Sequence, residues 1–410
     1  MSLTSAAPAR RAALPFIAVT ICLDVVSHSM VFPVLPRLVE DLAAHDRAAA
    51  ARWVGVLVAA WSLAQFVAAP VIGMLSDRFG RRPVILISVF GLAFDMVVMA
   101  LAPSIGWLLV GRILCGLTAG AQAAAMAYVA DITPPDERAG SYGWLNAAAW
   151  TGVILGPALG GLLGGIDPRA PFWAGAVCAL LNGLYGFFVL PESLPRERRA
   201  PLSLRRANPV AAMGLLTRPG LPVLAAVLLL LWFAAHAMYG VFVLYTAQRY
   251  GWSPLTLGVF WSVLAAINIV VQSQLAGRIA KRWGERRAVI VGLAAQTVGF
   301  LAAGLAPVGW MFWIANLPIA FGNIAGPALQ TLMTERVDPD EQGRLQGANG
   351  AIGSLSGLFG PIAFTQVFAW AIGLGHSPAW SGITMVFGGV LSGIAVLLTW
   401  RGVPKAAPKP

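Results

Sequence analysis

Long apolar runs alternate with short polar segments along the whole chain. Each run holds about 20 residues or more, which is enough for an α-helix to cross a hydrocarbon core of about 30 Å. This pattern predicts an all-α membrane protein with twelve transmembrane helices. The runs fall at residues 12–35, 52–76, 83–102, 106–132, 140–165, 170–190, 221–249, 254–277, 287–306, 309–334, 344–372 and 378–400.

The second half of the chain repeats the polar and glycine positions of the first half. At an offset of 204 residues, Gly277 and Gly284 correspond to Gly73 and Gly80, and Gly360-Pro361 corresponds to Gly156-Pro157. We therefore predict two pseudo-symmetric six-helix bundles, residues 1–190 and 220–410, joined by a cytoplasmic linker at 191–219. Two repeated halves around a central cleft are typical of secondary transporters, which open the cleft to one side at a time.

Composition and charge place the chain in lipid. Hydrophobic residues make up 58% of the sequence and charged residues only 11%, against about 25% in soluble domains. The net charge of +11 follows membrane topology: with the N-terminus inside, 22 of the 28 Lys and Arg residues lie in the termini and inner loops. Both termini are therefore expected to be cytoplasmic, with the arginines facing anionic membrane lipid and no nucleic acid as partner.

Enzyme motifs are absent from the sequence. There is no GxSxG, phosphate loop or HExxH, and the three cysteines (Cys22, Cys115 and Cys178) lie in apolar runs without metal-ligand spacing. We expect no enzymatic activity, no cofactor and no metal site. Transport would use an ion gradient, and the chain is expected to be a monomer that binds a small-molecule substrate and protons.

The loop from Gly73 to Pro83 resembles the signature loop of the major facilitator superfamily, and a second copy runs from Gly277 to Arg287. Gly73 would allow another helix to approach closely, Asp77 would meet a helix N-terminus, and the arginines would pair with Asp131. The resemblance implies that these residues gate the transporter. They are Gly73, Asp77, Arg78, Gly80, Arg81, Arg82 and Asp131, with Lys281 and Glu335 in the second copy. The alternative role is a positively charged anchor on the inner side.

The fifth run contains glycines at four-residue spacing and a proline. The segment from Gly152 to Gly161, with Gly156 and Pro157 at its centre, resembles the motif of the drug:proton antiporter branch of the superfamily. Pro157 removes a helix hydrogen bond and the glycines thin the helix, which favours a bend against the opposite half. The motif favours export over uptake, although such a kink also serves plain helix packing.

Further segments resemble the tetracycline:proton antiporters of that branch. The matching segments are Leu23-Asp24, Pro33 to Pro36, Gln65, Asp95, Ala130-Asp131, Arg249 to Trp252, Pro327 to Gln330 and Gln346-Gly347. Three positions depart from those antiporters: Gln296 replaces an acid, Asn268 a histidine, and His236 a glutamine. The resemblance implies proton coupling, while the departures argue against tetracycline itself as the substrate.

A few ionisable residues lie inside the apolar runs, where a charge is costly. Asp24 and Asp95 both fall about 18 Å from the inner edge, and His28 shares a helix face with Asp24. We predict proton coupling by Asp24, Asp95, His28, Arg112 and His236. The alternatives are a structural hydrogen bond for either aspartate, extension of Arg112 to the outer interface, and a backbone-bonded His236.

Polar residues in the runs predict the substrate contacts, which are Gln65, Asn146, His236, Asn268, Gln272, Gln296 and Gln330. Because few charges lie at mid-depth, an amphipathic organic compound is the expected substrate. The first hypothesis is proton-coupled efflux by alternating access, in a bacterial inner membrane. The alternatives are proton-coupled uptake of a small organic solute or metal chelate, and a non-transporting membrane receptor.

Overall fold

The computed structural model describes residues 7–134, 137–199, 213–239, 241–338, 341–373 and 378–403. Within these residues all regular structure is helical and no strand occurs. The chain forms two compact units. The first contains residues 1–38, 60–207 and 253–262, and the second contains 39–59, 208–252 and 263–410. The predicted linker at 191–219 lies partly outside the described residues.

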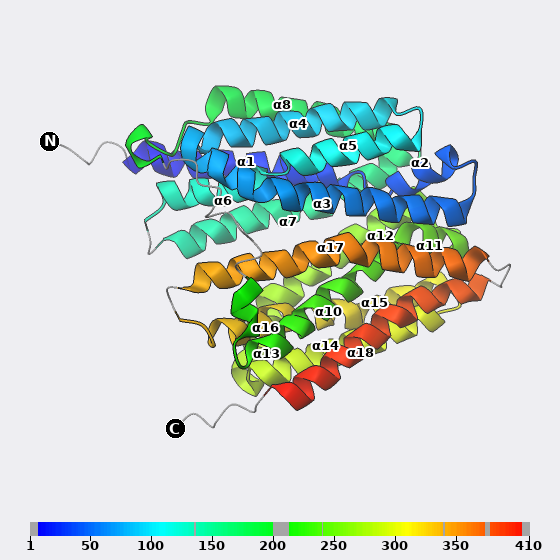
Figure 1. Ribbon diagram of the computed structural model, residues 1–410. Coiled ribbons are helices and arrows are strands. Elements are labelled where there is room, and N and C mark those ends of the chain that lie inside the picture. Colours follow the sequence, from blue (N-terminus) through cyan, green and yellow to red (C-terminus); the bar gives the residue numbers. More distant parts are fainter. Residues whose placement is uncertain are drawn as a thin grey trace. The chain divides into compact units, whose positions relative to one another are not determined.

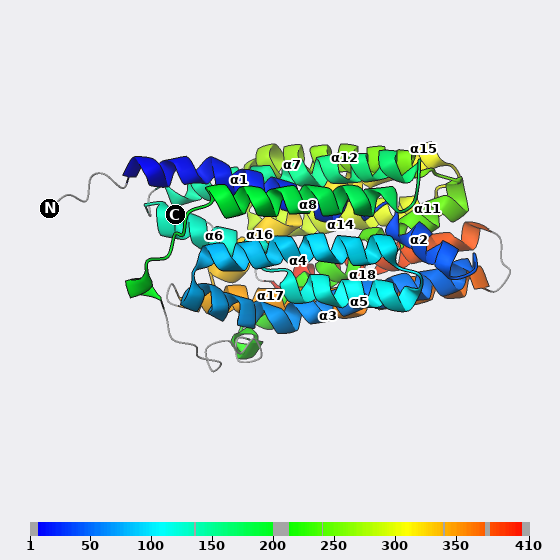
Figure 2. The ribbon, with the colours of Figure 1, turned by 90° about the horizontal axis from the view of Figure 1, so that it is seen from above.

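The first unit is a bundle of long helices (Figure 1). α1 (Ala7–Ser29) packs against α7 (Arg138–Gly164) and α8 (Ala170–Val189), while α4 (Arg81–Leu101) packs against α8, α5 (Ile105–Thr118) and α6 (Ala121–Ile132). Buried apolar residues such as Ile21, Ile85 and Tyr128 form its core. Figure 2 shows α4 lying between α8 and α5 in the view from above.

The second unit repeats this packing. α10 (Leu221–Tyr239) packs against α17 (Gln342–Gly373) and α18 (Ile383–Gly402), and α14 (Glu285–Leu305) packs against α18, α15 (Gly309–Gly322) and α16 (Ala325–Thr334). These are the pairs of the first unit shifted along the chain by about one repeat. The internal repeat read from glycines and acids is thus a repeat of helix packing.

The structure describes five further helices. They are α2 (Leu35–Leu42), α3 (Arg47–Phe79), α11 (Phe242–Tyr250), α12 (Pro254–Val270) and α13 (Gly277–Trp283), with short 3₁₀ turns at Arg196–Arg198, Gly214–Thr217 and Pro378–Gly382. A π-helical segment, Val271–Ala276, joins α12 to α13 and contains Gln272. Single π-turns are frequent at functional sites.

Four of the apolar runs are interrupted helices. The runs 12–35, 106–132, 221–249 and 309–334 break after Ser29, Thr118, Tyr239 and Gly322 respectively. These runs occupy the same place in each half of each repeat. The breaks escaped the sequence reading because small residues such as Ala119 and Gly120 keep the run apolar while they interrupt the helix.

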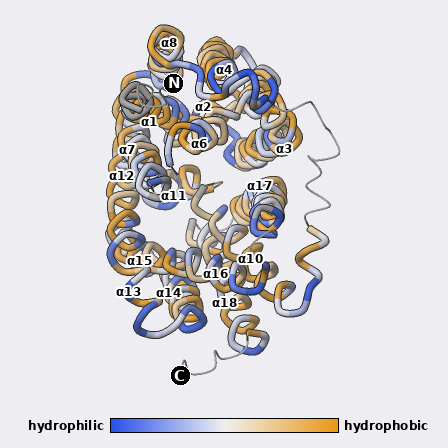
Figure 3. Tube along the Cα trace, turned by 90° about the vertical axis from the view of Figure 1, so that its left-hand side faces the viewer, coloured by the Kyte–Doolittle hydropathy of each residue, from blue (hydrophilic) through white to orange (hydrophobic). Residues whose placement is uncertain are grey.

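Length and hydropathy qualify eleven described helices as membrane spans. The apolar part of the first helix, Leu14–Ser29, is shorter, so the twelfth span and the side on which the termini lie stay predictions. Large apolar side chains face outward, with Phe188, Leu305 and Trp144 between 70% and 79% exposed. Figure 3 shows the hydrophobic colour concentrated along the helices. Such surfaces fit a hydrocarbon solvent.

The glycines of α7 bring it close to α1. A Cβ added at Gly152 or Gly156 would lie within 3 Å of α1, and one at Gly160 would lie within 3 Å of Met30, the residue that follows α1. The Ser29 hydroxyl donates to Gly152 O at 3.1 Å. On another face of α7, Gly161 lies against Pro254 and Gly258 of α12, in the same compact unit. Small residues permit such close approach where no hydrophobic effect drives helix association.

Replacement of Gly160 should therefore destabilise the fold. A Cβ at this position would lie 2.1 Å from Met30 O, a backbone atom that cannot rotate away. We expect Gly160→Ala to cost about 1–3 kcal/mol, as overpacking does, and to lower the melting temperature in detergent. Gly143→Ala on the same helix is the control, because a Cβ there meets no atom within 4 Å. Equal melting temperatures would refute the tight contact.

Candidate functional site

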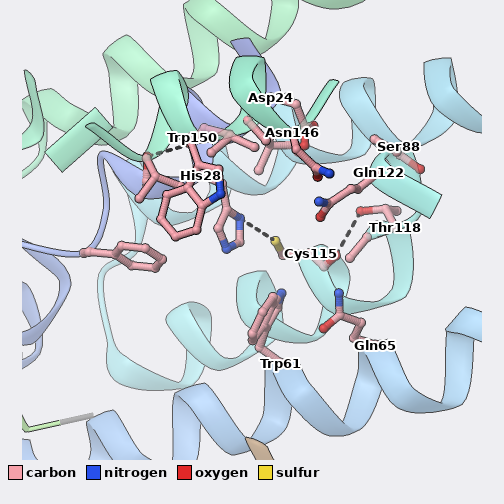
Figure 4. A pocket seen from close by; sticks show the side chains of 18 residues that line it. Asp24, His28, Trp61, Gln65, Ser88, Cys115, Thr118, Gln122, Asn146 and Trp150 are labelled. Atoms are coloured by element: carbon pink, nitrogen blue, oxygen red, sulfur yellow. Dashed lines mark hydrogen bonds between the residues drawn. The ribbon is translucent and has the colours of Figure 1, made fainter. Parts of the chain in front are cut away.

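The first unit contains a cavity of about 420 Å³, within the range for drug-sized ligands. Its wall is built by six helices: α1, α3, α4, α5, α6 and α7. Four predicted residues line it, namely Asp24, His28, Gln65 and Asn146. Figure 4 shows these side chains converging on the cavity together with Gln122, Trp61 and Trp150.

Asp24 lies on the cavity wall. No hydrogen bond or ion pair joins its carboxyl group to another side chain in the part of the chain that the structure describes. Asp24 and His28 share the cavity, as their four-residue spacing predicts, but they form no direct contact pair. The carboxyl group is thus available to a ligand or a proton from the cavity.

His28 is held by aromatic neighbours. Its ring centre lies 5.4 Å from that of Trp61 and 5.9 Å from that of Phe32, the latter in an edge-on arrangement. Its Nδ1 lies 3.9 Å from the Cys115 sulfur. These neighbours occupy the ring and its Nδ1, and the predicted pair of the imidazole with the Asp24 carboxylate is not formed.

Asp95 and Arg112 form a buried ion pair beside the cavity. Arg112 Nη2 donates to Asp95 Oδ2 at 3.1 Å, and the Asp95 side chain is fully buried. Arg112 also contacts the Met99 sulfur at 2.8 Å. Of the two readings of Arg112, the geometry matches the counter-ion and not the side chain that extends to the interface. Neither residue lines the cavity.

The loop between α3 and α4 is organised around Arg81. Its Nε donates to Asp131 Oδ2 at 3.1 Å, and its Nη1 donates to Asp77 Oδ1 at 2.5 Å. Gly80 has a φ of 112°, and Gly284, its partner in the repeat, has a φ of 80°. Only glycine adopts this backbone without strain, which explains why the repeat keeps it.

Three expectations about this loop differ from the structure. Arg82 donates to Phe187 O at 2.5 Å and Arg78 lies over the Phe79 ring, so Arg81 is the arginine that pairs with Asp131. A Cβ at Gly73 would meet no described atom within 4 Å, so the structure shows no close approach there and that role of Gly73 stays a prediction. Among the described residues, Asp77 binds Arg81.

Sequence reasoning missed two residues that complete this loop. Glu192, just after α8, accepts hydrogen bonds from the backbone N–H groups of Arg81 and Arg82 at 2.9 and 3.3 Å. The neighbouring Ser193 hydroxyl donates to Asp131 Oδ2 at 3.1 Å. A carboxylate at the first turn of α4 satisfies free N–H groups and the helix dipole. The separation of more than 100 residues hid this cap.

Loss of the Glu192 carboxylate should loosen the start of α4. We expect Glu192→Ala to lower the melting temperature by about 2–4 °C and to speed hydrogen exchange of the Arg81 and Arg82 amides. Glu197→Ala is the matched control, because Glu197 has no hydrogen-bond partner within the described ranges. Unchanged exchange at both amides would contradict the cap.

The second copy of the loop is arranged differently. No ion pair joins Lys281 to Glu335 among the residues that the structure describes. Arg286, the repeat partner of Arg82, donates to Val403 O and Trp400 O at 2.7 and 2.6 Å. Both repeats thus tie the start of their third helix to the end of their sixth through an arginine.

The predicted contacts in the second half lie outside this cavity. Asn268 accepts a hydrogen bond from Asn323, Gln330 accepts one from Asn349 at 2.8 Å, and Gln296 accepts one from Ser392 at 3.4 Å. These amides bond helices to each other. His236 lies against Gly360, and its buried Nδ1 has no partner within the described ranges.

Several lining residues were not predicted, among them Phe32, Ser88, Cys115 and Thr118. They are small or apolar, so the sequence alone does not distinguish them from residues that only pack one helix against another. Cys115 and Arg112 are three residues apart and so share one face of α5. That spacing could have indicated that Cys115 lies near the predicted Arg112 and the cavity.

Comparison with known proteins then decides the family. The model of the Major Facilitator Superfamily matches residues 17–361. The chain belongs to the Major Facilitator Superfamily. Its helical fold agrees with this: a bacterial homologue of the human lysosomal transporter Spinster, solved inward-facing and unoccupied, has a TM-score of 0.79 at 18% identity. The match covers 96% of this chain and 97% of that one.

This major facilitator also resembles tetracycline resistance proteins over nearly its whole length. The class C protein of Escherichia coli is 37% identical over 386 residues, covering 93% of this chain and 95% of that protein. The class G protein of Vibrio anguillarum is 34% identical over 373 residues, covering 90% and 92%. The resemblance read from the motifs is confirmed, and the chain is a multi-pass membrane transporter.

Proposed function

We propose that this major facilitator is a proton-coupled exporter of an amphipathic organic compound. The observation that carries the proposal is the Asp24 carboxyl group on a partly apolar cavity, where it has no side-chain partner among the described residues. A carboxyl group that is reached from the cavity can hold either a proton or a polar group of the substrate. If the substrate and the proton replace each other at this carboxyl group, they are carried across the membrane in opposite directions.

The cavity suits an amphipathic molecule. Phe32, Trp61 and Trp150 supply flat apolar walls, while Gln65, Gln122 and Asn146 supply amide donors and acceptors. No hydrogen bond to a described residue occupies the three amides. A ligand with an aromatic body and a polar edge finds both kinds of partner.

The exporter proposal also assigns roles to the two halves of the chain, to the Arg81 cluster and to α7. The halves 1–190 and 220–410 would move about the linker, with both termini in the cytoplasm of a bacterial cell. The Arg81 cluster would hold one of the states, and Gly156 and Pro157 would shape α7. The relatives' resistance to tetracycline favours export, and tetracycline itself belongs among the compounds to be tested.

Reconstituted vesicles with an imposed pH gradient test the direction of coupling. The probes are tetracycline and ethidium, with the membrane potential clamped and protein-free vesicles as the control. Antiport predicts that a transported probe accumulates in vesicles with an acidic lumen. Accumulation in vesicles with an alkaline lumen would replace the proposal with proton-coupled uptake.

A further inference from the structure

Asp95 is a buried carboxyl group with one oxygen unused. Its Oδ2 accepts a hydrogen bond from Arg112, whereas its Oδ1 is buried and has no hydrogen-bond partner among the described residues. The Asp95 side chain is fully buried and does not line the cavity. An ionisable group at such a place is costly in lipid. If Asp95 takes part in proton coupling, a proton needs a path to it through other side chains.

Cys115 links this buried acid to the cavity wall. The free Oδ1 of Asp95 faces α5, because a Cβ added at Gly111 would lie 2.8 Å from it. Cys115 follows Gly111 by four residues and therefore lies on the same face of α5. Its thiol lies close enough to the Asp95 carboxyl group to interact with it, and Cys115 also lines the cavity. The thiol is thus shared between the buried acid and the cavity.

His28 extends this link into the cavity. Its Nδ1 lies 3.9 Å from the Cys115 sulfur, a contact that Figure 4 marks with a dashed line, and both residues line the cavity. The rings of Trp61 and Phe32 pack on the imidazole and keep it at this place. An imidazole takes up a proton at one nitrogen and gives one up at the other. A thiol is both a weak donor and a weak acceptor.

We infer that His28 and Cys115 relay protons between the cavity and Asp95. A proton from water in the cavity binds His28 Nε2, while Nδ1 gives its proton to the Cys115 sulfur and the thiol gives its own proton to Asp95 Oδ1. Imidazole and thiol keep one proton each, one proton has entered, and Asp95 is neutral. Exchange with water returns the imidazole proton to Nδ1, and the reverse order empties Asp95. The inference rests on the proposed proton coupling and gives a second carboxyl group, besides Asp24, a route to the cavity.

A proton on Asp95 removes the charge that pairs with Arg112. Because this pair joins α4 to α5, loading and unloading of Asp95 would weaken and restore the contact between the two helices. The titratable or charged groups around the path are Asp24 and His28 on α1, Asp95 on α4, and Arg112 and Cys115 on α5. The polar residues that α3, α6 and α7 place on the cavity wall do not titrate in this range; they are Trp61, Gln65, Gln122, Asn146 and Trp150.

Infrared spectroscopy after a rapid change of pH tests the relay on the purified full chain in detergent. The carbonyl band of protonated Asp95 is assigned by its loss in Asp95→Asn. We expect Cys115→Ala to slow both the rise and the decay of this band by about tenfold or more. The pH at which half of Asp95 is protonated should stay almost unchanged, because a relay alters the rates in both directions and leaves the equilibrium alone.

Further variants assign the path to the two side chains. Cys115→Ser keeps a group that donates and accepts a proton, so it should retain most of the rate, which also guards against a variant that fails to fold. His28→Phe should be as slow as Cys115→Ala, and the double variant no slower than either, since both residues lie on one path. Cys178→Ala is the matched control, because Cys178 lines a separate apolar pocket beside Leu23.

Unchanged rates in Cys115→Ala or in His28→Phe would overturn the inference. So would a Cys115→Ser variant as slow as Cys115→Ala, or the absence of the Asp95 band at every pH at which the protein is folded. These outcomes differ from failure of the proposed function, because the measurement uses no gradient and no substrate. A chain with a working relay that never exchanges a substrate for protons would overturn the exporter proposal alone.

Discussion

Asp24→Asn is expected to abolish uphill transport while the protein stays folded. The amide has nearly the shape of the carboxyl group but cannot take up a proton. Asp24 forms no ion pair or hydrogen bond with another described side chain, so its replacement breaks no polar side-chain contact among the described residues. We expect accumulation driven by a pH gradient to fall by about 100-fold or more, with the melting temperature nearly unchanged.

The measurement is accumulation of ethidium or tetracycline, whichever the unaltered protein transports, in vesicles with an acidic lumen and a clamped membrane potential. Asp41→Asn serves as the control, because it removes an exposed carboxyl group of the same type. Asp24→Asn can still let the probe equilibrate across the membrane without a gradient, since this step needs no proton. Accumulation of the probe by Asp24→Asn at the level of the unaltered protein would contradict the prediction.

Breaking the Asp95–Arg112 pair should produce the largest loss of stability. Arg112→Gln leaves the Asp95 carboxylate with its main partner removed, and Asp95 is 0% exposed. Removal of one member of a buried ion pair costs about 3–5 kcal/mol, whereas replacement of both members can be close to neutral. We therefore expect Arg112→Gln to unfold at a clearly lower temperature and Asp95→Asn/Arg112→Gln to regain most of the loss.

Unfolding of the three proteins in detergent, followed by intrinsic tryptophan fluorescence, checks this prediction. The double variant is its own control, since it removes the same guanidinium without leaving a lone buried charge. If the double variant were as unstable as Arg112→Gln, the pair would not be the source of the loss. A stable Arg112→Gln would show that the ion pair is unimportant for the fold.

The sequence was sufficient for features that depend on local chemistry or on the repeat. The positive φ at Gly80 and Gly284 lies where the repeated loop places glycine. Four polar residues in otherwise apolar runs line the same cavity, as expected from the sequence. They are Asp24, His28, Gln65 and Asn146. A polar residue is costly in lipid unless it faces other polar groups or a cavity, and the position of these four residues agrees with that rule.

Other features depend on neighbours that only folding brings together. His28 bonds to no carboxylate because Trp61 and Phe32 hold its ring, and these lie on other turns or helices. Gln296 was predicted as a substrate contact, yet it is buried and bonds α14 to Ser392 of α18. A polar residue that joins helices has the same sequence signal as one that lines a cavity.

The interplay of substrate and proton at Asp24 can be measured most directly as proton release from the purified protein. The probe is ethidium or tetracycline, whichever the vesicle measurement shows to be transported. In weakly buffered detergent solution, its addition to the unaltered chain and to folded Asp95→Asn should acidify the medium in proportion to the amount bound. Asp24→Asn should release nothing. Release of protons by Asp24→Asn equal to that of the unaltered chain would contradict the account.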